Sequence, residues 1–458
     1  MCGERFEPLY PLLSRKQNRY NSRMREIIIV DDLAPEAGAM VQALYSRDPK
    51  SVKDHLIQVR EKGAEKFMAN FYVGYGHKSI GDCGTTSIFV ENVSMLVAKA
   101  VQDWPLYSGQ EASTRYLDMA AQEVLNPLGT PEGKAIQDEW MRFYKHALEK
   151  LIPVLKTRFP IQPEQKETVY EKAIKARAFD IARGFLPAGV TTFAAWHTNL
   201  RQAYDHIKEM RHHPLAEVRE VANMIHEELK KKYMSSFSHK EYPTEEEYIE
   251  KSMAEFAFWD DADAVKGFSY DARLLDLKGL ARHQKLLAER PAKAELHQRL
   301  RQYGSISFSF PLDFGSYRDL QRHRSLVQEM PLLTTGHGFY AWYLEQLPED
   351  LRSEALAVIA AQEKKIAALK IPGDAPETVR QYYIAMGYTV AVKVTGPLPA
   401  AVYTAELRSA DTVHPTLRIQ AQRMGDAILA AVPGIAMHHD TSPGTWNIKR
   451  GTHDIVRK

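Results

Sequence analysis

Residues 108–116 read Ser-Gly-Gln-Glu-Ala-Ser-Thr-Arg-Tyr, the most informative stretch of the chain. Its hydroxyls, the carboxylate of Glu111 and the guanidinium of Arg115 could together bind a phosphorylated sugar, because arginine offers phosphate a two-pronged set of donors. Ser and Glu also favour the first turn of a helix, so a solvated helix start explains the same residues. The spacing alone leaves both interpretations open.

Residues 318–324 read Arg-Asp-Leu-Gln-Arg-His-Arg and concentrate positive charge. On a helix, Arg318 would lie one turn before Arg322, with Arg324 on a different side. Three arginines and a histidine so close together repel one another, and a polyanion such as pyrophosphate or a reduced flavin would relieve that repulsion. An exposed basic helix face is the alternative, because such faces are common.

A third group of polar residues begins at 180–187, which read Asp-Ile-Ala-Arg-Gly-Phe-Leu-Pro. Asn199-Leu200-Arg201 and Glu209-Met210-Arg211 follow it. The next two residues, His212 and His213, diverge on a helix, so we expect no metal site. The sequence has no Walker A run and no G-x-G-x-x-G, C-x-x-C or H-E-x-x-H motif.

The composition is that of an ordinary globular protein, with 458 residues, 60 of them basic and 58 acidic. This length suits two or three domains. The balanced charge gives no general reason to expect a nucleic-acid or membrane partner. The two cysteines, Cys2 and Cys83, favour free thiols in a reducing compartment, and no signal peptide or membrane span is evident. We therefore expect a cytoplasmic protein.

The second half of the chain repeats the first in outline. The matches are Phe89 with Phe308, Lys99 with Arg318, Gln102 with Gln321, and Glu209-Met210-Arg211 with Glu406-Leu407-Arg408. They predict a tandem duplication, with chance similarity between amphipathic segments as the alternative. The expected division is an N-terminal arm at 1–26, a first repeat at 27–233, a connector at 234–296, a second repeat at 297–432 and a tail at 433–458.

Periodicity and turn residues predict the elements of each repeat. We expect a buried strand at 27–30 and further strands at 85–90, 305–310 and 388–393. We expect helices from Pro35, at 49–71, from Val93, and at 132–158, 169–185, 198–233, 317–324, 351–369 and 404–432, with breaks at Pro214 and Pro415.

Together these stretches resemble the flavin-dependent thymidylate synthases, the ThyX family. The family signature is an Arg-His-Arg triplet followed shortly by S-x-x-E-x-S-x-R-Y, with an H-x-S-P-F-E-H-like segment upstream. Residues 110–116 closely match the second part, and 77–82 resemble the upstream segment, with Asp82 in place of Glu. Further on, the family has A-R-x-x-L-P, N-x-R and L-R segments, which are similar to 182–187, 199–201 and 210–211. The resemblance covers about 27–230 well and about 300–430 more weakly.

Each half departs from this signature in a different place. In the first half Asp103-Trp104-Pro105 stands where the triplet should be, whereas the second half keeps the triplet at Arg322-His323-Arg324. The residues after it, 325–335, contain no S-x-R-Y. The second half keeps Glu406-Leu407-Arg408 but has no clear arginine before Met386-Gly387. The losses are complementary, so the two halves could share one site.

The resemblance implies an α+β fold in which each repeat is a small mixed sheet wrapped by long helices. It implies a homodimer that rebuilds a pseudo-tetramer. The implied reaction is reductive methylation of dUMP to dTMP with FAD, NADPH and methylenetetrahydrofolate, and no protein nucleophile is needed. C5 alkylation of another pyrimidine nucleotide, or an inactive protein that binds flavin or nucleotide, are the alternatives.

The resemblance also assigns roles to particular residues. The substrate dUMP would be held by Glu111, Ser113, Arg115, Arg183 and Arg211, and Ser113, Arg115 and Arg211 would form the catalytic set. The cofactors would be bound by Arg322, His323, Arg324, His77, Ser79, Asn199 and Arg201. Tyr116 is a packing residue in this interpretation. A composite site would combine Ser113 and Arg115 of the first half with the triplet of the second, and it requires Arg115 to lie within about 20 Å of an Arg322.

Overall fold

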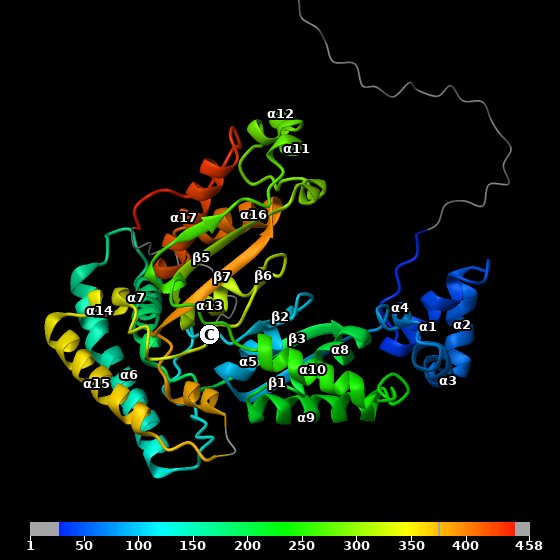
Figure 1. Ribbon diagram of the computed structural model, residues 1–458, viewed down its shortest axis with the longest axis horizontal. Coiled ribbons are helices and arrows are strands. Elements are labelled where there is room, and N and C mark those ends of the chain that lie inside the picture. The colour runs from blue at the N-terminus through cyan, green and yellow to red at the C-terminus, as the bar shows by residue number, and fades with distance from the viewer. Residues whose placement is uncertain (1–26, 374–375, 445–458) are drawn as a thin grey trace, which may run out of the picture. The chain divides into compact units, whose positions relative to one another are not determined.

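The computed structural model describes residues 27–373 and 376–444. A compact unit begins at Pro35 and holds two small antiparallel sheets among many helices (Figure 1). Within the described residues, no helix is both long enough and apolar enough to cross a membrane. The two sheets and the helices around them confirm the predicted α+β class with two repeats.

The residues before this unit correct one prediction. Ile27–Val30, predicted as a buried strand, form no strand, and Ile27 and Ile29 are 93% and 85% exposed. An apolar β-branched run becomes a strand only where a neighbouring strand accepts its backbone hydrogen bonds. The predicted arm at 1–26 lies outside the described residues.

The sheet of the first repeat has the strand order β1-β3-β2. Its strands are β1 (Thr85–Ser94), β2 (Ser108–Glu111) and β3 (Thr191–Asn199). The sequence predicted no strand at β3, although its Thr, Phe and Trp side chains favour strands, and the predicted helix at 198–233 overlaps only its last two residues. Asn199 ends the strand and caps the helix that follows, because its side chain accepts a hydrogen bond from the backbone N–H of Gln202 at 2.8 Å.

The sheet of the second repeat has the strand order β4-β5-β7-β6. Its strands are β4 (Ser269–Asp271), β5 (Ser305–Asp313), β6 (Val327–Gln328) and β7 (Thr389–Pro397). Pairing is antiparallel throughout both sheets, which corrects the mixed sheets expected from the resemblance, because apolar periodicity does not determine strand direction. One face of β5 is fully buried and forms part of the core through Ile306, Phe308, Phe310 and Leu312.

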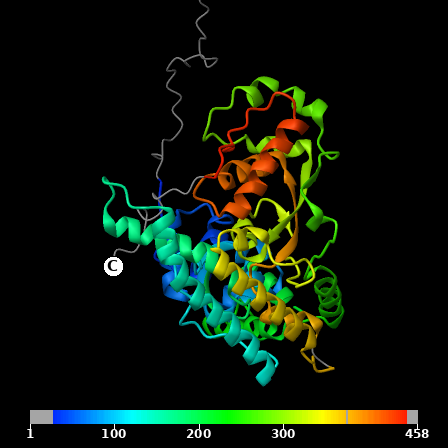
Figure 2. The ribbon, with the colours of Figure 1, turned by 90° about the vertical axis from the view of Figure 1, so that its left-hand side faces the viewer.

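Helices cover both sheets (Figures 1 and 2). Those of the first repeat are α1 (Pro35–Tyr45), α2 (Val52–Lys62), α3 (Glu65–Phe67), the π-helix η1 (Met68–Gly74), α4 (Lys78–Gly81), α5 (Met95–Gln102), α6 (Pro131–Arg158), α7 (Glu167–Ala182), the 3₁₀ turn η2 (Arg183–Phe185), α8 (Leu200–Met210) and α9 (Ala216–Lys232). The helix predicted at 49–71 is interrupted at Gly63, whose φ of +70° is incompatible with a right-handed helix.

The remaining helices belong to the connector and the second repeat. They are α10 (Pro243–Phe256), η3 (Ala264–Lys266), α11 (Leu277–Ala281), α12 (Gln284–Ala288), η4 (Gln298–Tyr303), α13 (Phe314–Leu320), α14 (Ala341–Glu345), α15 (Glu349–Ala368), η5 (Glu377–Tyr383), α16 (Leu398–Arg408) and α17 (Pro415–Ala431). The long helices α6 and α15 lie side by side in both views (Figures 1 and 2).

The element bounds of the two repeats correspond closely. β3 and β7 begin at 191 and 389, and α8 and α16 begin at 200 and 398, so both pairs are related by a shift of 198 residues. α5 and α13 begin at 95 and 314, so Lys99 and Arg318 occupy the same position, as predicted. The 198-residue shift places Met210 opposite Arg408, which corrects the predicted match of Arg211 with Arg408 by one residue.

A bulge in β1 corrects the other predicted match. Asn92, with a φ of +57°, is an extra residue that β5 lacks. Before the bulge, strand register therefore places Ile88, rather than Phe89, opposite Phe308. The side chains agree, because Phe89 is 73% exposed and Phe308 is 1% exposed.

The repeats meet through reciprocal backbone hydrogen bonds. The N–H of Ala188 donates to the carbonyl of Ile384 at 2.9 Å, and the N–H of Met386 donates to that of Leu186 at 2.8 Å. Under the 198-residue shift each bond is the counterpart of the other. The repeats are thus joined by an approximate twofold contact inside one chain.

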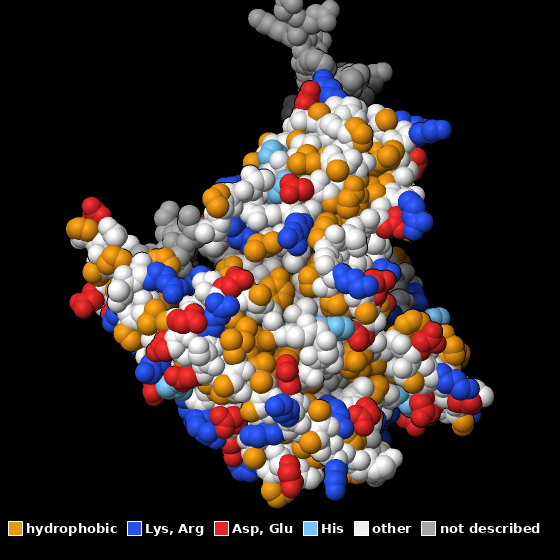
Figure 3. Space-filling view, turned by 60° about the vertical axis from the view of Figure 1, so that its left-hand side comes forward, with side chains coloured by type: hydrophobic (Ala, Val, Ile, Leu, Met, Phe, Trp, Pro, Cys, Tyr) orange, Lys and Arg blue, Asp and Glu red, His pale blue; other side chains and the backbone are white. Residues whose placement is uncertain are grey.

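On the face shown in Figure 3, acidic and basic side chains are interspersed.

Candidate functional site

A buried ion cluster joins the two repeats at their shared position. Lys99 Nζ lies 2.6 Å from Glu111 Oε2, and Arg318 donates to the other carboxylate oxygen at 2.5 Å. All three side chains are buried. Burial alone would raise the pKa of Glu111, but Arg318 and Lys99 outweigh it and hold the pKa at about 2. Glu111, predicted to contact nucleotide, is thus bound within the protein.

Arg318 also fixes the segment that carries Arg115. Its guanidinium donates to Thr114 Oγ1 at 3.0 Å and to the carbonyl of Ala112 at 2.9 Å. This holds residues 112–115 of the first repeat against α13 of the second. Ser113 lies in the same segment and accepts a hydrogen bond from the backbone N–H of Arg115 at 3.3 Å.

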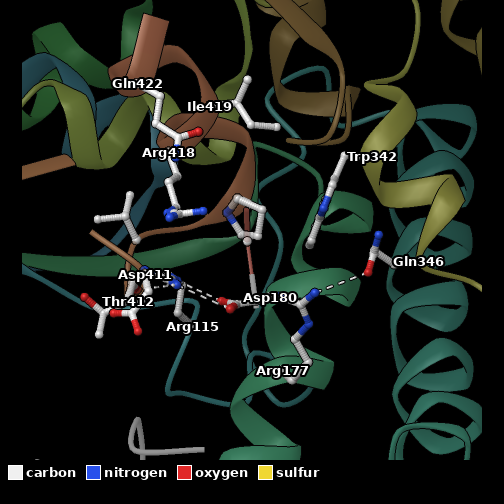
Figure 4. A pocket seen from close by; sticks show the side chains of 13 residues that line it. Arg115, Arg177, Asp180, Trp342, Gln346, Asp411, Thr412, Arg418, Ile419 and Gln422 are labelled. Carbon is white, nitrogen blue, oxygen red and sulfur yellow. Dashed lines mark hydrogen bonds and ion pairs between the residues drawn. The ribbon is translucent and has the colours of Figure 1, made fainter. Parts of the chain in front are cut away.

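Arg115 is held by partners from both repeats (Figure 4). Its Nε and Nη2 donate to the two carboxylate oxygens of Asp180 at 2.7 and 3.3 Å. Nη2 also donates to the carbonyl of Thr412 at 3.2 Å. Nη1 has no hydrogen-bond partner among the described residues. The forked contact with Asp180 therefore orients the guanidinium and leaves one nitrogen for an anion.

The cavity in Figure 4 has a volume of about 350 Å³ and is lined by both repeats. Arg115, Arg177 and Asp180 come from the first repeat, and Trp342 and Arg418 from the second. The guanidinium of Arg177 lies 5.3 Å from the centre of the Trp342 ring, a cation–π arrangement. We call this space the inter-repeat cavity.

The Arg322-His323-Arg324 triplet lines a second cavity, of about 380 Å³. Its other charged or aromatic lining residues include Arg301, Tyr403 and Arg408, and we call this space the triplet pocket. The triplet lies in a turn rather than on the predicted helix, because α13 ends at Leu320. The side chain of Gln328 donates to the carbonyl of Leu320 at 3.3 Å and so satisfies one of the groups that the helix end exposes.

His323 is a buried hydrogen-bond relay. Arg408 Nε donates to His323 Nε2 at 2.7 Å, so the proton resides on Nδ1, which lies 3.1 Å from Thr404 Oγ1. Burial and the charge of Arg408 lower the pKa of His323 to about 3, which keeps the ring neutral. The arrangement orients Arg408 and leaves both imidazole nitrogens occupied.

Three arginines that line the triplet pocket, Arg322, Arg324 and Arg408, differ in their hydrogen-bond partners. Arg324 Nη1 donates to the carbonyl of Tyr107, in the first repeat. Arg408 Nη2 donates to the carbonyl of Asp319 at 2.7 Å. Arg322, by contrast, is exposed and has no hydrogen-bond or ion-pair partner within the described part of the chain.

The carboxyl group of Asp319 is influenced by arginines from both repeats. Burial alone would raise the pKa of its carboxyl group, but nearby guanidinium groups lower that pKa to about 2. These groups belong to Arg115 and Arg183 of the first repeat and to Arg322 and Arg408 of the second. The structure therefore brings Arg115 and Arg322 of a single chain within electrostatic reach of one carboxylate.

Two other predicted nucleotide ligands have internal partners. Arg183 is 1% exposed, and its Nη2 donates to Ser316 Oγ at 2.7 Å. Arg211 lies outside both cavities, where it donates to Asn223 Oδ1 and Glu241 Oε1, each at 3.0 Å. In this conformation Arg183 contacts the second repeat rather than either cavity, and Arg211 lines neither cavity.

The four cofactor ligands predicted in the first repeat lie away from the triplet pocket. His77, directly before α4, and Ser79, within α4, are exposed, and Arg201 forms an ion pair of 2.7 Å with Asp82. Asn199 serves as the cap of α8. None of them lines the triplet pocket.

The counterpart of that segment in the second repeat does line the triplet pocket. Allowing for the extra residue of the β1 bulge, His77 to Gly84 correspond to His297 to Gly304, and each segment ends in glycine directly before a strand. Gln298 and Arg301, on η4, line the pocket. Sequence reasoning missed both residues, although the shared histidine and glycine were a usable signal.

The first repeat has a different arrangement where the second has its triplet. Asp103 corresponds to Arg322, and burial together with the carboxylates of Glu209 and Glu329 raises its pKa to about 7. Trp104 corresponds to His323 and stacks on His206, with ring centres 4.8 Å apart. Nowhere in 27–373 or 376–444 do three or more His, Cys, Asp or Glu side chains form a group that could hold a metal ion.

Residues 30–233, which hold the first repeat, match the family model described as thymidylate synthase complementing protein, in line with the resemblance of the sequence.

Three curated relatives match the chain well beyond that unit. A UPF0159 protein of Thermoplasma acidophilum is 23% identical and aligns over 88% of this chain and 94% of its own. UPF0159 proteins of Chlamydia muridarum and Chlamydia pneumoniae are 26% and 28% identical. The Chlamydia muridarum protein aligns over 82% of this chain and 81% of its own length, and the Chlamydia pneumoniae protein aligns over 76% of each. These names state no activity.

Proposed function

We propose that the protein is a FAD-dependent thymidylate synthase that methylates dUMP at C5, with methylenetetrahydrofolate and NADPH as co-reactants. One observation carries the proposal. The positive charges of Arg115 from the first repeat and Arg322 from the second both lower the pKa of the same carboxyl group, that of Asp319, in one chain. This supports a composite site in which the two repeats of one chain each supply part of the signature.

Each ligand has a cavity suited to its charge. Arg115 is oriented by Asp180 and keeps one nitrogen for the nucleotide phosphate, with Ser113 beside it. The triplet pocket fits an anionic flavin, because Arg322 is unpaired and Arg324 and Arg408 are fixed by carbonyl groups. A bound flavin, reduced by NADPH, would supply the hydride. The chain itself would bind and orient the reactants and hold positive charge beside the cofactor.

The assembly and setting follow from the same proposal. We propose a cytoplasmic homodimer that rebuilds a pseudo-tetramer, with one composite site in each chain. The site needs no thiol nucleophile, and neither cavity is lined by a cysteine among the described residues.

A binding protein without turnover is the second candidate, and one observation favours it. Glu111 and Arg183, both predicted to contact nucleotide, are buried in contacts between the repeats. A third candidate, C5 alkylation of another pyrimidine nucleotide, would use the same groups.

Complementation of a thymidine-requiring bacterial strain tests the proposal. We expect growth without thymidine from the wild-type chain and none from Arg322→Ala. The purified wild-type protein should be yellow and should release FAD on denaturation. Absence of flavin absorbance after incubation with excess FAD would contradict the proposal. A flavin-bound protein that does not support growth would favour the second or third candidate.

A further inference from the structure

The triplet pocket contains more positive charge than the triplet itself. Four guanidinium groups line it, those of Arg301, Arg322, Arg324 and Arg408, against the single carboxylate of Glu295. Like charges converging on about 380 Å³ repel one another, and this repulsion favours an anionic ligand.

Two of these four arginines have donors to spare. Arg301 Nη1 donates only to Gln298 Oε1, in its own turn, at 3.3 Å. Arg322 has no partner in the described ranges. The two belong to different elements, since Arg301 is on η4 and Arg322 is in the turn after α13. Because both line the same cavity, a ligand with two adjacent anionic groups could use donors from both elements at once.

Comparison of the repeats shows that this charge belongs to the pocket rather than to the fold. The first-repeat counterparts of Arg301, Arg322, Arg324 and Arg408 are Gly81, Asp103, Pro105 and Met210. At Gly81 even a Cβ atom would come within 2.6 Å of the Tyr72 ring, so the first repeat has no room there for a side chain. The repeat that keeps the triplet therefore has an arginine at every one of these positions, and the other repeat has none.

We infer that the triplet pocket recognises a diphosphate group and that Arg301 is the residue that distinguishes a diphosphate from a monophosphate. A single phosphate can be bound by the triplet side alone. A second, adjacent phosphate would reach η4, where Arg301 can offer a forked pair of donors. The inference rests on the proposed flavin site and deepens it, because FAD carries a diphosphate and FMN a monophosphate.

Binding of FAD and FMN to purified Arg301→Gln tests the inference through quenching of flavin fluorescence. We expect the affinity for FAD to fall about tenfold, as for loss of one charge-assisted contact, and that for FMN to change less than threefold. Arg299→Gln is the matched control, because Arg299 is an exposed arginine two residues away that lines neither cavity. It should leave both affinities unchanged. Equal losses for FAD and FMN, or no loss for either, would overturn the inference.

Two further measurements separate its failure from other failures. Arg301→Lys keeps the charge without the fork, and we expect it to bind FAD more tightly than Arg301→Gln but less tightly than wild type. If wild type binds no flavin at all, the proposed function fails, and ADP and AMP become the probes. Wild type, but not Arg301→Gln, should then be protected from thermal unfolding more by ADP than by AMP. Equal protection by the two nucleotides would overturn the inference.

Discussion

The triplet pocket and its counterpart in the first repeat occupy the same place in two copies of one fold, yet their charges are opposite. In the second repeat, Arg322 is unpaired beside the neutral ring of His323. In the first, Asp103 lies near two other carboxylates, and Trp104 stacks on His206. The strands and helices around both places match, so backbone and core are retained while the cluster of arginines is not. Two copies of one fold can therefore place side chains of opposite charge at the same position without any change in the surrounding strands and helices.

The largest expected effect comes from making the two places alike. Replacing the triplet with the first repeat's residues, as Arg322→Asp, His323→Trp and Arg324→Pro, should lower FAD affinity more than about a hundredfold, because two cations are lost and an anion is gained. Bound-flavin absorbance after gel filtration measures this. Lys364→Ala, on the exposed surface of α15, is the control and should change affinity less than twofold. A comparable loss in the control would mean that long-range charge, not the triplet, holds the flavin.

A smaller effect is expected where the first repeat contributes to the site. Arg115→Ala should weaken dUMP binding by roughly 1.5–3 kcal/mol, about ten- to a hundredfold, through loss of one charge-assisted phosphate contact. Calorimetry decides the point. Arg142→Ala removes an exposed arginine of α6 and should have no effect. An affinity within twofold of wild type for Arg115→Ala would mean that residues 110–116 serve only the interface between the repeats.

His323→Gln should reduce FAD affinity only a few-fold. The amide can still accept a hydrogen bond from Arg408, but it cannot hold Arg408 and Thr404 in the same geometry. Because the pKa of His323 is about 3, FAD binding between pH 5 and 8 should not depend on its titration. The difference between wild type and His323→Gln should therefore be the same across that range, and a difference that grows below pH 6.5 would contradict the neutral assignment.

The smallest effect is on stability and concerns the acidic counterpart. The pKa of Asp103 is about 7 in the folded chain, well above the ordinary value of 3.8 for this group, so the folded state binds the proton more tightly. Asp103 therefore contributes stability at low pH that is lost as the pH rises through about 7. Asp103→Asn removes this loss, and the melting temperature should increase at pH 8 by more than it does at pH 5. Equal changes at the two pH values would show that Asp103 does not titrate in this way.

The sequence predicted the fold best where periodicity is long. The helices α6, α15 and α17 and the strands β1 and β5 lie close to their predicted positions, because their apolar patterns extend over several turns or alternations. β3 was missed, since its alternating residues run directly into α8 without a break. The one-residue error at Phe89 came from a bulge, which no apolar pattern reveals.

The site was harder to predict than the fold. The complementary losses predicted a composite site of Arg115 and the triplet, but left open whether one chain or two would supply it. The partners of Glu111 and Arg183 did not follow, because Arg318 and Ser316 are more than a hundred residues away in sequence and belong to the other repeat. Whether an arginine faces a cavity or the core depends on such long-range contacts, which spacing along the chain does not encode.

The central claim is that one chain assembles one complete site from its two repeats. The direct test mixes an Arg115→Ala chain with an Arg322→Ala chain, unfolds and refolds them together, and records the change that dUMP causes in bound-flavin absorbance. The first chain should bind flavin without nucleotide, and the second nucleotide without flavin. Because Arg115 and Arg322 of the same chain both act on the charge of Asp319, the account predicts no dUMP-induced change in the mixture, while wild type shows one. A change restored in the mixture would place the site between two chains and contradict it.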